Sequence, residues 1–97
     1  MRKYELLMIA TPELEEEGIA ELSEWAQGVI TSNGGEIVEA EVLGRRRLAY
    51  PIKHKTDGTY VLIHAGMENN TIAELERSLK LNEQSLRHIL VRLDDES

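Results

Sequence analysis

Five basic side chains in one short segment carry the clearest chemical signal in this sequence. Residues 43–55 read LGRRRLAYPIKHK and hold five of the eleven Lys and Arg residues but no acidic residue. The whole chain has 18 Asp and Glu residues and a formal net charge of -7. A basic segment in an acidic protein is typical of contact with a polyanion, because guanidinium groups match phosphate oxygens. The alternative interpretation is a solvated loop between two strands.

The first interpretation predicts contacts to the phosphate backbone of a nucleic acid. The candidate residues are Arg2, Lys3, Arg45, Arg46, Arg47, Lys53, His54, Lys55 and Arg87. Three consecutive arginines on a strand point to alternate sides, so at least one must face away from the core. Because the net charge is negative, the chain should bind RNA poorly alone. Either a basic partner assists it, or the contacts are confined to one rim.

Catalytic and metal chemistry have little support. The three histidines, His54, His64 and His88, fall in different predicted elements, and none has a second ligand at metal-binding spacing. The sequence has no cysteine, which removes disulfides and thiolate sites, and it has no phosphate-cradling glycine motif. An acyl-phosphate hydrolase would need an anion-binding loop after the first strand, where Thr11-Pro12-Glu13 supplies an acid instead. We predict no catalytic residue, metal, cofactor or small-molecule substrate.

Length and hydropathy predict one domain over residues 1–97. No run of apolar residues is long enough to span a membrane, and the start of the chain does not resemble a signal peptide. We therefore expect a cytoplasmic location and no membrane partner. Residues 94–97 are expected to form a frayed acidic tail.

The predicted elements alternate in a regular order. Strands are expected at 3–10, 36–49, 59–67 and 86–93, with a turn at 53–58 whose sharpest signal is Asp57-Gly58. A first helix is expected from Thr11 as N-cap to Asn33-Gly34-Gly35, and a second opens at 69–71 with Thr71 and Glu74 as a capping box. Gly44 predicts a bulge or a bend, and Pro51 predicts that the strand ends there or lies at a sheet edge.

This order predicts an α+β ferredoxin-like fold, the split βαβ arrangement, with a four-stranded antiparallel sheet and two helices on one face. The first and third strands would form the central pair. Their helix-free side would carry Leu7, Ile9, Tyr60 and Leu62, and exposed apolar side chains of this kind favour a contact surface. Only one aromatic residue lies there, so readout of single-stranded RNA by base stacking is not expected. A poorly covered sheet face is the alternative.

Several stretches of the chain resemble one known family. They are Met1-Arg2-Lys3-Tyr4-Glu5, the ten residues LGRRRLAYPI at 43–52, Asp57-Gly58-Thr59-Tyr60 and Leu86-Arg87-His88. Together they are similar to the bacterial small-subunit ribosomal protein six family over nearly the whole chain. The middle stretch is the most specific of the four.

The resemblance implies a structural protein on the platform of the small ribosomal subunit. Such a protein pairs with the basic small-subunit ribosomal protein eighteen, and the pair binds the central domain of small-subunit ribosomal RNA. By position, Arg2, Tyr4, the 45–55 segment and Arg87 would contact RNA or this partner. The expected partner-binding residues are Tyr4, Leu7, Ile9, Tyr50, Tyr60 and Leu62.

A second hypothesis is a ferredoxin-like, homo-oligomeric small-molecule-sensing domain that associates through its sheet face. It explains the apolar face equally well. It leaves the basic segment without a role.

Overall fold

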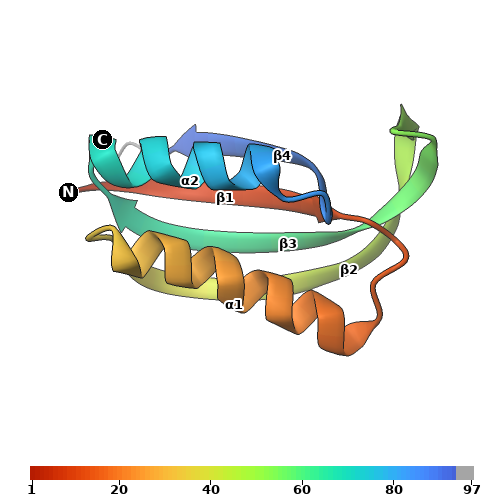
Figure 1. The fold of residues 1–97 in the computed structure, drawn as a ribbon, viewed down its shortest axis with the longest axis horizontal. Helices are drawn as coiled ribbons and strands as arrows, with labels where there is room; N and C mark the ends of the chain where they lie inside the picture. The colour runs from red at the N-terminus through yellow and green to blue at the C-terminus, as the bar shows by residue number, and fades with distance from the viewer. Residues whose placement is uncertain (94–97) are drawn as a thin grey trace.

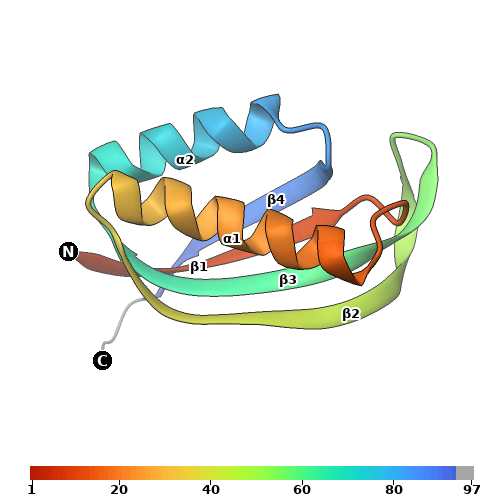
Figure 2. The same ribbon diagram turned by 60° about the horizontal axis from the view of Figure 1, so that its bottom comes forward.

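A four-stranded antiparallel sheet covered on one face by two helices forms the molecule (Figures 1 and 2). The computed structural model describes residues 1–93, so the predicted acidic tail lies outside the described residues. The elements are β1 (Arg2–Ala10), α1 (Glu16–Ser32), β2 (Glu36–Ile52), β3 (Lys55–Met67), α2 (Asn69–Leu81) and β4 (Ser85–Arg92). This order confirms the predicted ferredoxin-like α+β fold.

The strands lie in the order β2-β3-β1-β4, so β1 and β3 are the central pair as predicted. In the β1–β3 ladder Leu7 lies opposite Leu62, and in the β1–β4 ladder it lies opposite Ile89. Because side chains alternate across a strand, this register fixes which side of the sheet each residue occupies. Among the described residues, no helix is long and apolar enough to cross a membrane.

The main core fills the space between the helices and the sheet. Leu6, Met8 and Ala10 of β1 point toward the helices and are buried. They pack with these further buried residues: Ile19, Leu22, Ala26, Ile30, Val61, Ile63, Ala65, Met67, Leu75 and Leu79. Each helix therefore contributes buried residues spaced three or four positions apart, which form one face of the helix.

The first helix begins later than predicted. Thr11 is not its N-cap, because its backbone N–H donates to the Gln84 carbonyl oxygen at 2.9 Å and prolongs the sheet edge. The chain then turns, and helix α1 starts at Glu16 with Glu15 as N-cap.

The predicted end of α1 is confirmed in detail. Gly34 has φ +90, and the Gly34 and Gly35 N–H groups donate to the carbonyls of Thr31 and Ile30. These two hydrogen bonds form the Schellman motif, which needs a residue that tolerates positive φ.

The capping box of α2 differs from the predicted one. Glu68 is the N-cap, so Thr71 stands at the third helical position and accepts the Glu68 N–H through its hydroxyl. The same Thr71 hydroxyl donates to the Asn33 carbonyl oxygen at 2.8 Å. Thr71 therefore joins the start of α2 to the end of α1.

The hairpin between β2 and β3 turns at the start of the predicted range, residues 53–58, and not at Asp57-Gly58. Ile52 pairs with Lys55, so the turn consists of Lys53 and His54 alone. Both have positive φ, 50 and 69, as a two-residue type I′ turn requires. The prediction at Asp57-Gly58 is wrong because those residues pair with Arg47 and Arg46 inside the ladder.

Strand β2 is an irregular edge strand, as its sequence predicted. The register of β2 against β3 shifts at three places: between Ile37 and Glu39, between Val42 and Gly44, and between Arg47 and Ile52. Gly44 has φ +105. The hairpin bends away from the plane of the sheet at one end of the molecule (Figure 1).

Candidate nucleic-acid and partner interface

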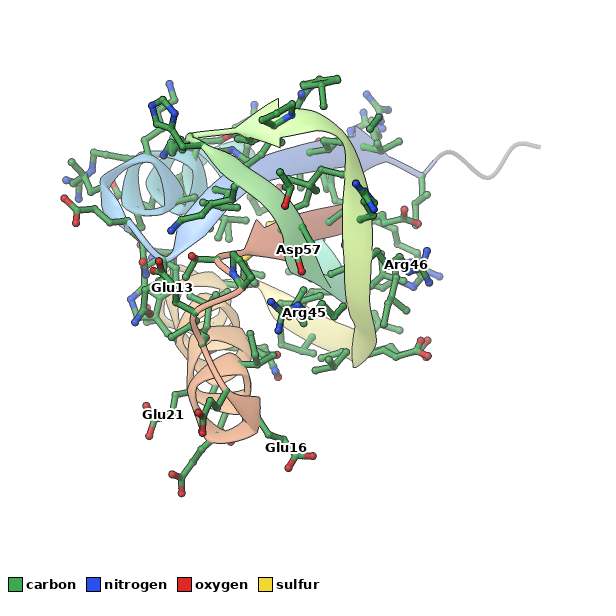
Figure 3. The ribbon with its side chains drawn as sticks, turned by 90° about the vertical axis from the view of Figure 1, so that its right-hand side faces the viewer. Glu13, Glu16, Glu21, Arg45, Arg46 and Asp57 are labelled. Atoms are coloured by element: carbon green, nitrogen blue, oxygen red, sulfur yellow. The ribbon has the colours of Figure 1, made fainter. Side chains whose placement is uncertain are left out.

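The three consecutive arginines divide between the two sides of β2. Arg46 pairs with Gly58 and its guanidinium carbon lies 5.6 Å from the centre of the Tyr60 ring, on the helix-free side. Arg45 points to the opposite side of the ribbon (Figure 3). A cation over an aromatic face is attractive, and this contact holds Arg46 along the sheet surface.

Two of the predicted cations are bound within the chain. The Arg45 Nε donates to Asp57 Oδ2 at 2.7 Å, across the hairpin. The Lys55 ammonium donates to the carboxylate of Glu13, in the loop before α1. This hydrogen bond and the charge of Lys55 lower the pKa of the Glu13 carboxyl. Arg45 and Lys55 therefore have structural partners that a polyanion would have to displace.

Other predicted cations have no such partner. Within the described residues, Arg46, Arg47 and Lys53 form no ion pair, and all three side chains are exposed. His54 is also exposed, beside Lys53 in the turn. We refer to Arg46, Arg47 and Lys53 as the free cations of the hairpin. They can reach a polyanion without breaking an ion pair, although Arg46 would give up its contact with the Tyr60 ring.

The remaining basic candidates lie elsewhere on the molecule. Arg2 and Lys3 begin β1, at the opposite end of the sheet from the hairpin turn (Figure 1). Arg87 on β4 donates to the Tyr50 hydroxyl at 2.7 Å, and Tyr50 itself is exposed. The nine predicted RNA contacts thus form two groups rather than one continuous patch.

The helix-free side of the sheet differs from its predicted appearance. Leu7, Tyr60 and Leu62 are half-buried on it, but Ile9 is only 5% exposed. Ile9 is covered because the end of β2 folds over this face and places Leu48 against Ile9 and Leu86. The expectation of an exposed Ile9 is wrong for this reason.

Tyr4 lies apart from the other predicted partner-binding residues. It packs beside the main core, because it shares the helix side of β1 with Leu6 and Met8. Tyr4 therefore belongs to a different surface from Leu7, Tyr60 and Leu62.

Strand β4 contributes two apolar residues that the sequence analysis missed. Ile89 and Val91 are 41% and 46% exposed and lie opposite Leu7 and Glu5. With Leu7 and Leu62 they form an apolar strip, hereafter the sheet strip. Apolar residues at every second position, Ile89, Val91 and Leu93, were the sequence signal for an apolar face on this strand.

A polar cluster closes one end of the sheet strip. His64 Nε2 lies 3.0 Å from Glu5 Oε1, and its Nδ1 lies 3.9 Å from Glu39 Oε1. Over residues 1–93 no group of three His, Asp or Glu side chains has the arrangement of a metal site.

The comparisons with known proteins agree on one family. The family model described as Ribosomal protein S6 matches residues 3–92 of this chain. The chain belongs to the ribosomal protein S6 family. This is a family of structural ribosomal proteins and not of enzymes.

Individual members of the ribosomal protein S6 family show how close the similarity is. The chain is 41% identical over 95 residues to the small ribosomal subunit protein bS6 of Syntrophobacter fumaroxidans. The match covers 98% of this chain and 65% of that protein, so the chain spans about two thirds of its relative's length.

A solved structure of the same family has the same fold as this chain. The crystal structure of 30S ribosomal protein S6 from Thermotoga maritima superposes with a TM-score of 0.89 at 29% identity. The match covers 95% of this chain and 87% of the other.

Proposed function

We propose that this S6-family chain is a cytoplasmic structural component of the small ribosomal subunit. In that role it binds the central domain of small-subunit ribosomal RNA together with small-subunit ribosomal protein eighteen. The observation that carries the proposal is the hairpin of an acidic chain, which keeps three cations free of any acid among residues 1–93.

The RNA contact is electrostatic in this proposal. Arg46, Arg47 and Lys53 meet backbone phosphates, with His54 at the same turn. Arg45 and Lys55 hold the shape of the hairpin through Asp57 and Glu13. Arg87 joins the hairpin group, because it donates to Tyr50 and lines a hollow with Lys53. Arg2 and Lys3 make a second contact group at the other end of the sheet.

The protein partner occupies the helix-free face. The sheet strip supplies apolar area, and the exposed Tyr50 extends it at the end near Arg87. The chain's net charge of -7 makes a basic partner favourable, because that partner neutralises the chain's repulsion of RNA.

The decisive experiment measures binding of a central-domain RNA fragment across a range of salt concentrations, with and without protein eighteen. The chain alone should bind weakly, and the pair tightly. The double variant R46A/R47A should reduce the slope of log affinity against log salt by about two, because each phosphate contact contributes roughly one unit.

The matched control is R77A on α2, whose guanidinium pairs with Glu74 at 2.9 Å on the helix side. This variant should leave both affinity and salt slope unchanged. Equal salt slopes for the double variant and the wild-type chain would show that the hairpin does not touch RNA.

The homo-oligomeric sensing domain makes a different prediction for the same face. Sedimentation should then show a stable homodimer that does not respond to ribosomal RNA. The ribosomal proposal instead expects a monomer until the partner is added.

A further inference from the structure

A basic hollow lies where the hairpin turn, the end of α2 and the start of β4 meet. It has a volume of about 290 Å³. Lys53 lines it from the turn, Lys80 from the last turn of α2, and Ser85, Arg87 and His88 from β4. Residues far apart in sequence therefore place two lysines and an arginine around one hollow.

A buried hydroxyl in this hollow has no partner. Ser85 is 4% exposed, and within residues 1–93 its Oγ is the buried side-chain polar atom that makes no hydrogen bond. A buried hydroxyl left without a partner costs free energy. An oxygen of a bound anion would accept its proton and remove that cost.

The charges around the hollow favour an anion despite two opposing groups. Lys53 and Lys80 form no ion pair with any described residue, and Arg87 keeps further donors beyond the one bound to Tyr50. The Glu76 carboxylate opposes an anion, but it is bound to His88. The negative end of the α2 dipole also opposes an anion, and Lys80 lies at that end.

We propose that this hollow binds a phosphate group, with Lys53, Lys80 and Arg87 supplying charge and Ser85 donating a hydrogen bond. The phosphate belongs either to an RNA backbone or to a small free anion such as inorganic phosphate. Only the RNA source rests on the proposed function. Binding of the free anion is measured on the chain alone and stands independently of it.

The test follows backbone amide signals by nuclear magnetic resonance in the full chain. One arm adds inorganic phosphate at constant ionic strength, with chloride as the reference. The other adds a short RNA oligonucleotide. Saturable shifts at Ser85, His88 and Lys80 are expected in at least one arm. The double variant K53Q/K80Q should bind about tenfold more weakly, because each lost charge removes a charge-assisted contact.

Two further variants separate a binding site from a structural feature. S85A should weaken binding severalfold while the thermal midpoint of the ligand-free chain stays equal or rises, because an unsatisfied hydroxyl has been removed. R77Q is the control and should bind like the wild-type chain, because Arg77 pairs with Glu74 and does not line the hollow.

The two arms of the experiment distinguish the possible ligands of the hollow. Shifts with inorganic phosphate identify the free anion as a ligand, and shifts with the oligonucleotide alone identify a backbone phosphate. Absence of saturable shifts in both arms, or equal binding by K53Q/K80Q and R77Q, would overturn the site. Failure of the ribosomal proposal would appear separately, as loss of central-domain RNA binding by the pair.

Discussion

Gly58 shows how closely the two central strands approach beside the second core cluster. A Cβ atom at this position would lie 2.6 Å from Ile9 Cγ2 and 2.9 Å from the Ala10 carbonyl oxygen. The Ala10 carbonyl oxygen belongs to the backbone of a central strand, so it cannot move away from an added Cβ atom as the end of a flexible side chain could. The position therefore requires glycine for its lack of a side chain.

The expected result of G58A is a loss of about 1–3 kcal/mol in the free energy of unfolding, as for overpacked cores. Chemical denaturation measures it. G28A in α1 is the control, because a Cβ there meets nothing within 4 Å, and it should stabilise the helix by roughly 0.5–1 kcal/mol. Equal effects of the two variants would contradict the close approach at Gly58.

The Glu13–Lys55 pair predicts a pH-dependent contribution to stability. Lys55 lowers the folded-state pKa of Glu13 below its ordinary value of 4.5, so the carboxylate form stabilises the fold. That stabilisation is present above pH 4.5 and disappears as the pH falls through the lowered folded value. The effect should be small because the pair is solvent-exposed.

Urea denaturation across the acid range measures this contribution. E13Q should be less stable than the wild-type chain at neutral pH, and the difference should shrink to nothing in strong acid. E21Q on the outer face of α1 is the control (Figure 3). A difference between E13Q and the wild-type chain that stayed constant with pH would exclude the ion pair as its cause.

Individual residue roles were less predictable from the sequence than the elements were. The 45–55 segment was identified from its composition. Composition could not show that Arg45 pairs with Asp57 while Arg47 forms no ion pair within residues 1–93. The partner of Lys55 is Glu13, 42 residues earlier. No local pattern reports such a pairing, because it depends on how the loop before α1 returns to the sheet.

Among the elements, the β2–β3 hairpin combines an unfavourable turn with a basic tip. Lys53 and His54 occupy positive φ, a region that costs non-glycine residues about 1–2 kcal/mol each. Asparagine and glycine are the favoured residues of such turns. The sequence thus keeps a lysine and a histidine where the fold alone would favour other residues.

The variant H54G should raise the free energy of unfolding by about 0.5–1 kcal/mol, since relief of strain exceeds the added freedom of the unfolded chain. Thermal denaturation checks it. T56G, two residues later in β3, should instead destabilise the chain, because glycine weakens a strand. If H54G lost as much stability as T56G, the turn would not have the conformation described.

The hairpin also shows where pattern reasoning failed. Asp57-Gly58 is a strong turn signal, yet both residues lie in a ladder, and the true turn has no glycine or asparagine. The helix end at Gly34-Gly35 was predictable because there the local signal and the fold agree. A glycine is a misleading turn signal where it is needed for close packing of two strands, as at Gly58.

At the scale of the whole molecule, charge and apolar surface are segregated. The outer face of α1 carries acids including Glu16 and Glu21, while the free cations stand at the hairpin (Figure 3). The sheet strip faces away from both helices. In the proposed function, RNA at the hairpin and a protein partner on the sheet strip would therefore occupy neighbouring parts of one small chain.

Partner binding should depend on the sheet strip. I89K should leave the free energy of unfolding within about 1 kcal/mol of the wild-type chain, because this side chain lies on an exposed edge strand. It should reduce affinity for protein eighteen at least tenfold, because it places a charge in an apolar contact facing a basic protein. Isothermal titration calorimetry measures the affinity.

L81K is the control for this prediction. Leu81 is 72% exposed at the end of α2, on the helix side, and its replacement should not alter partner affinity. Full affinity in I89K would mean that the partner binds another face.

The overall fold was predictable from alternation and capping signals, whereas the shape of the helix-free face was not. Ile9 lies on the helix-free side of β1, where the alternation of the strand predicts an exposed residue. It is nevertheless covered by Leu48. That cover comes from the irregular second half of β2, where the register shifts at Gly44 and again between Arg47 and Ile52.

The irregularity of β2 has one more consequence, for the behaviour of the chain at high concentration. A strand of 17 residues at a sheet edge offers unpaired N–H and C=O groups to any other strand. Here the bulge at Gly44, the missing donor of Pro51 and the row of charged side chains prevent a second copy from extending the sheet. Deletion of Gly44, which would straighten this edge, should promote association of the chain through β2, and sedimentation at high protein concentration measures it.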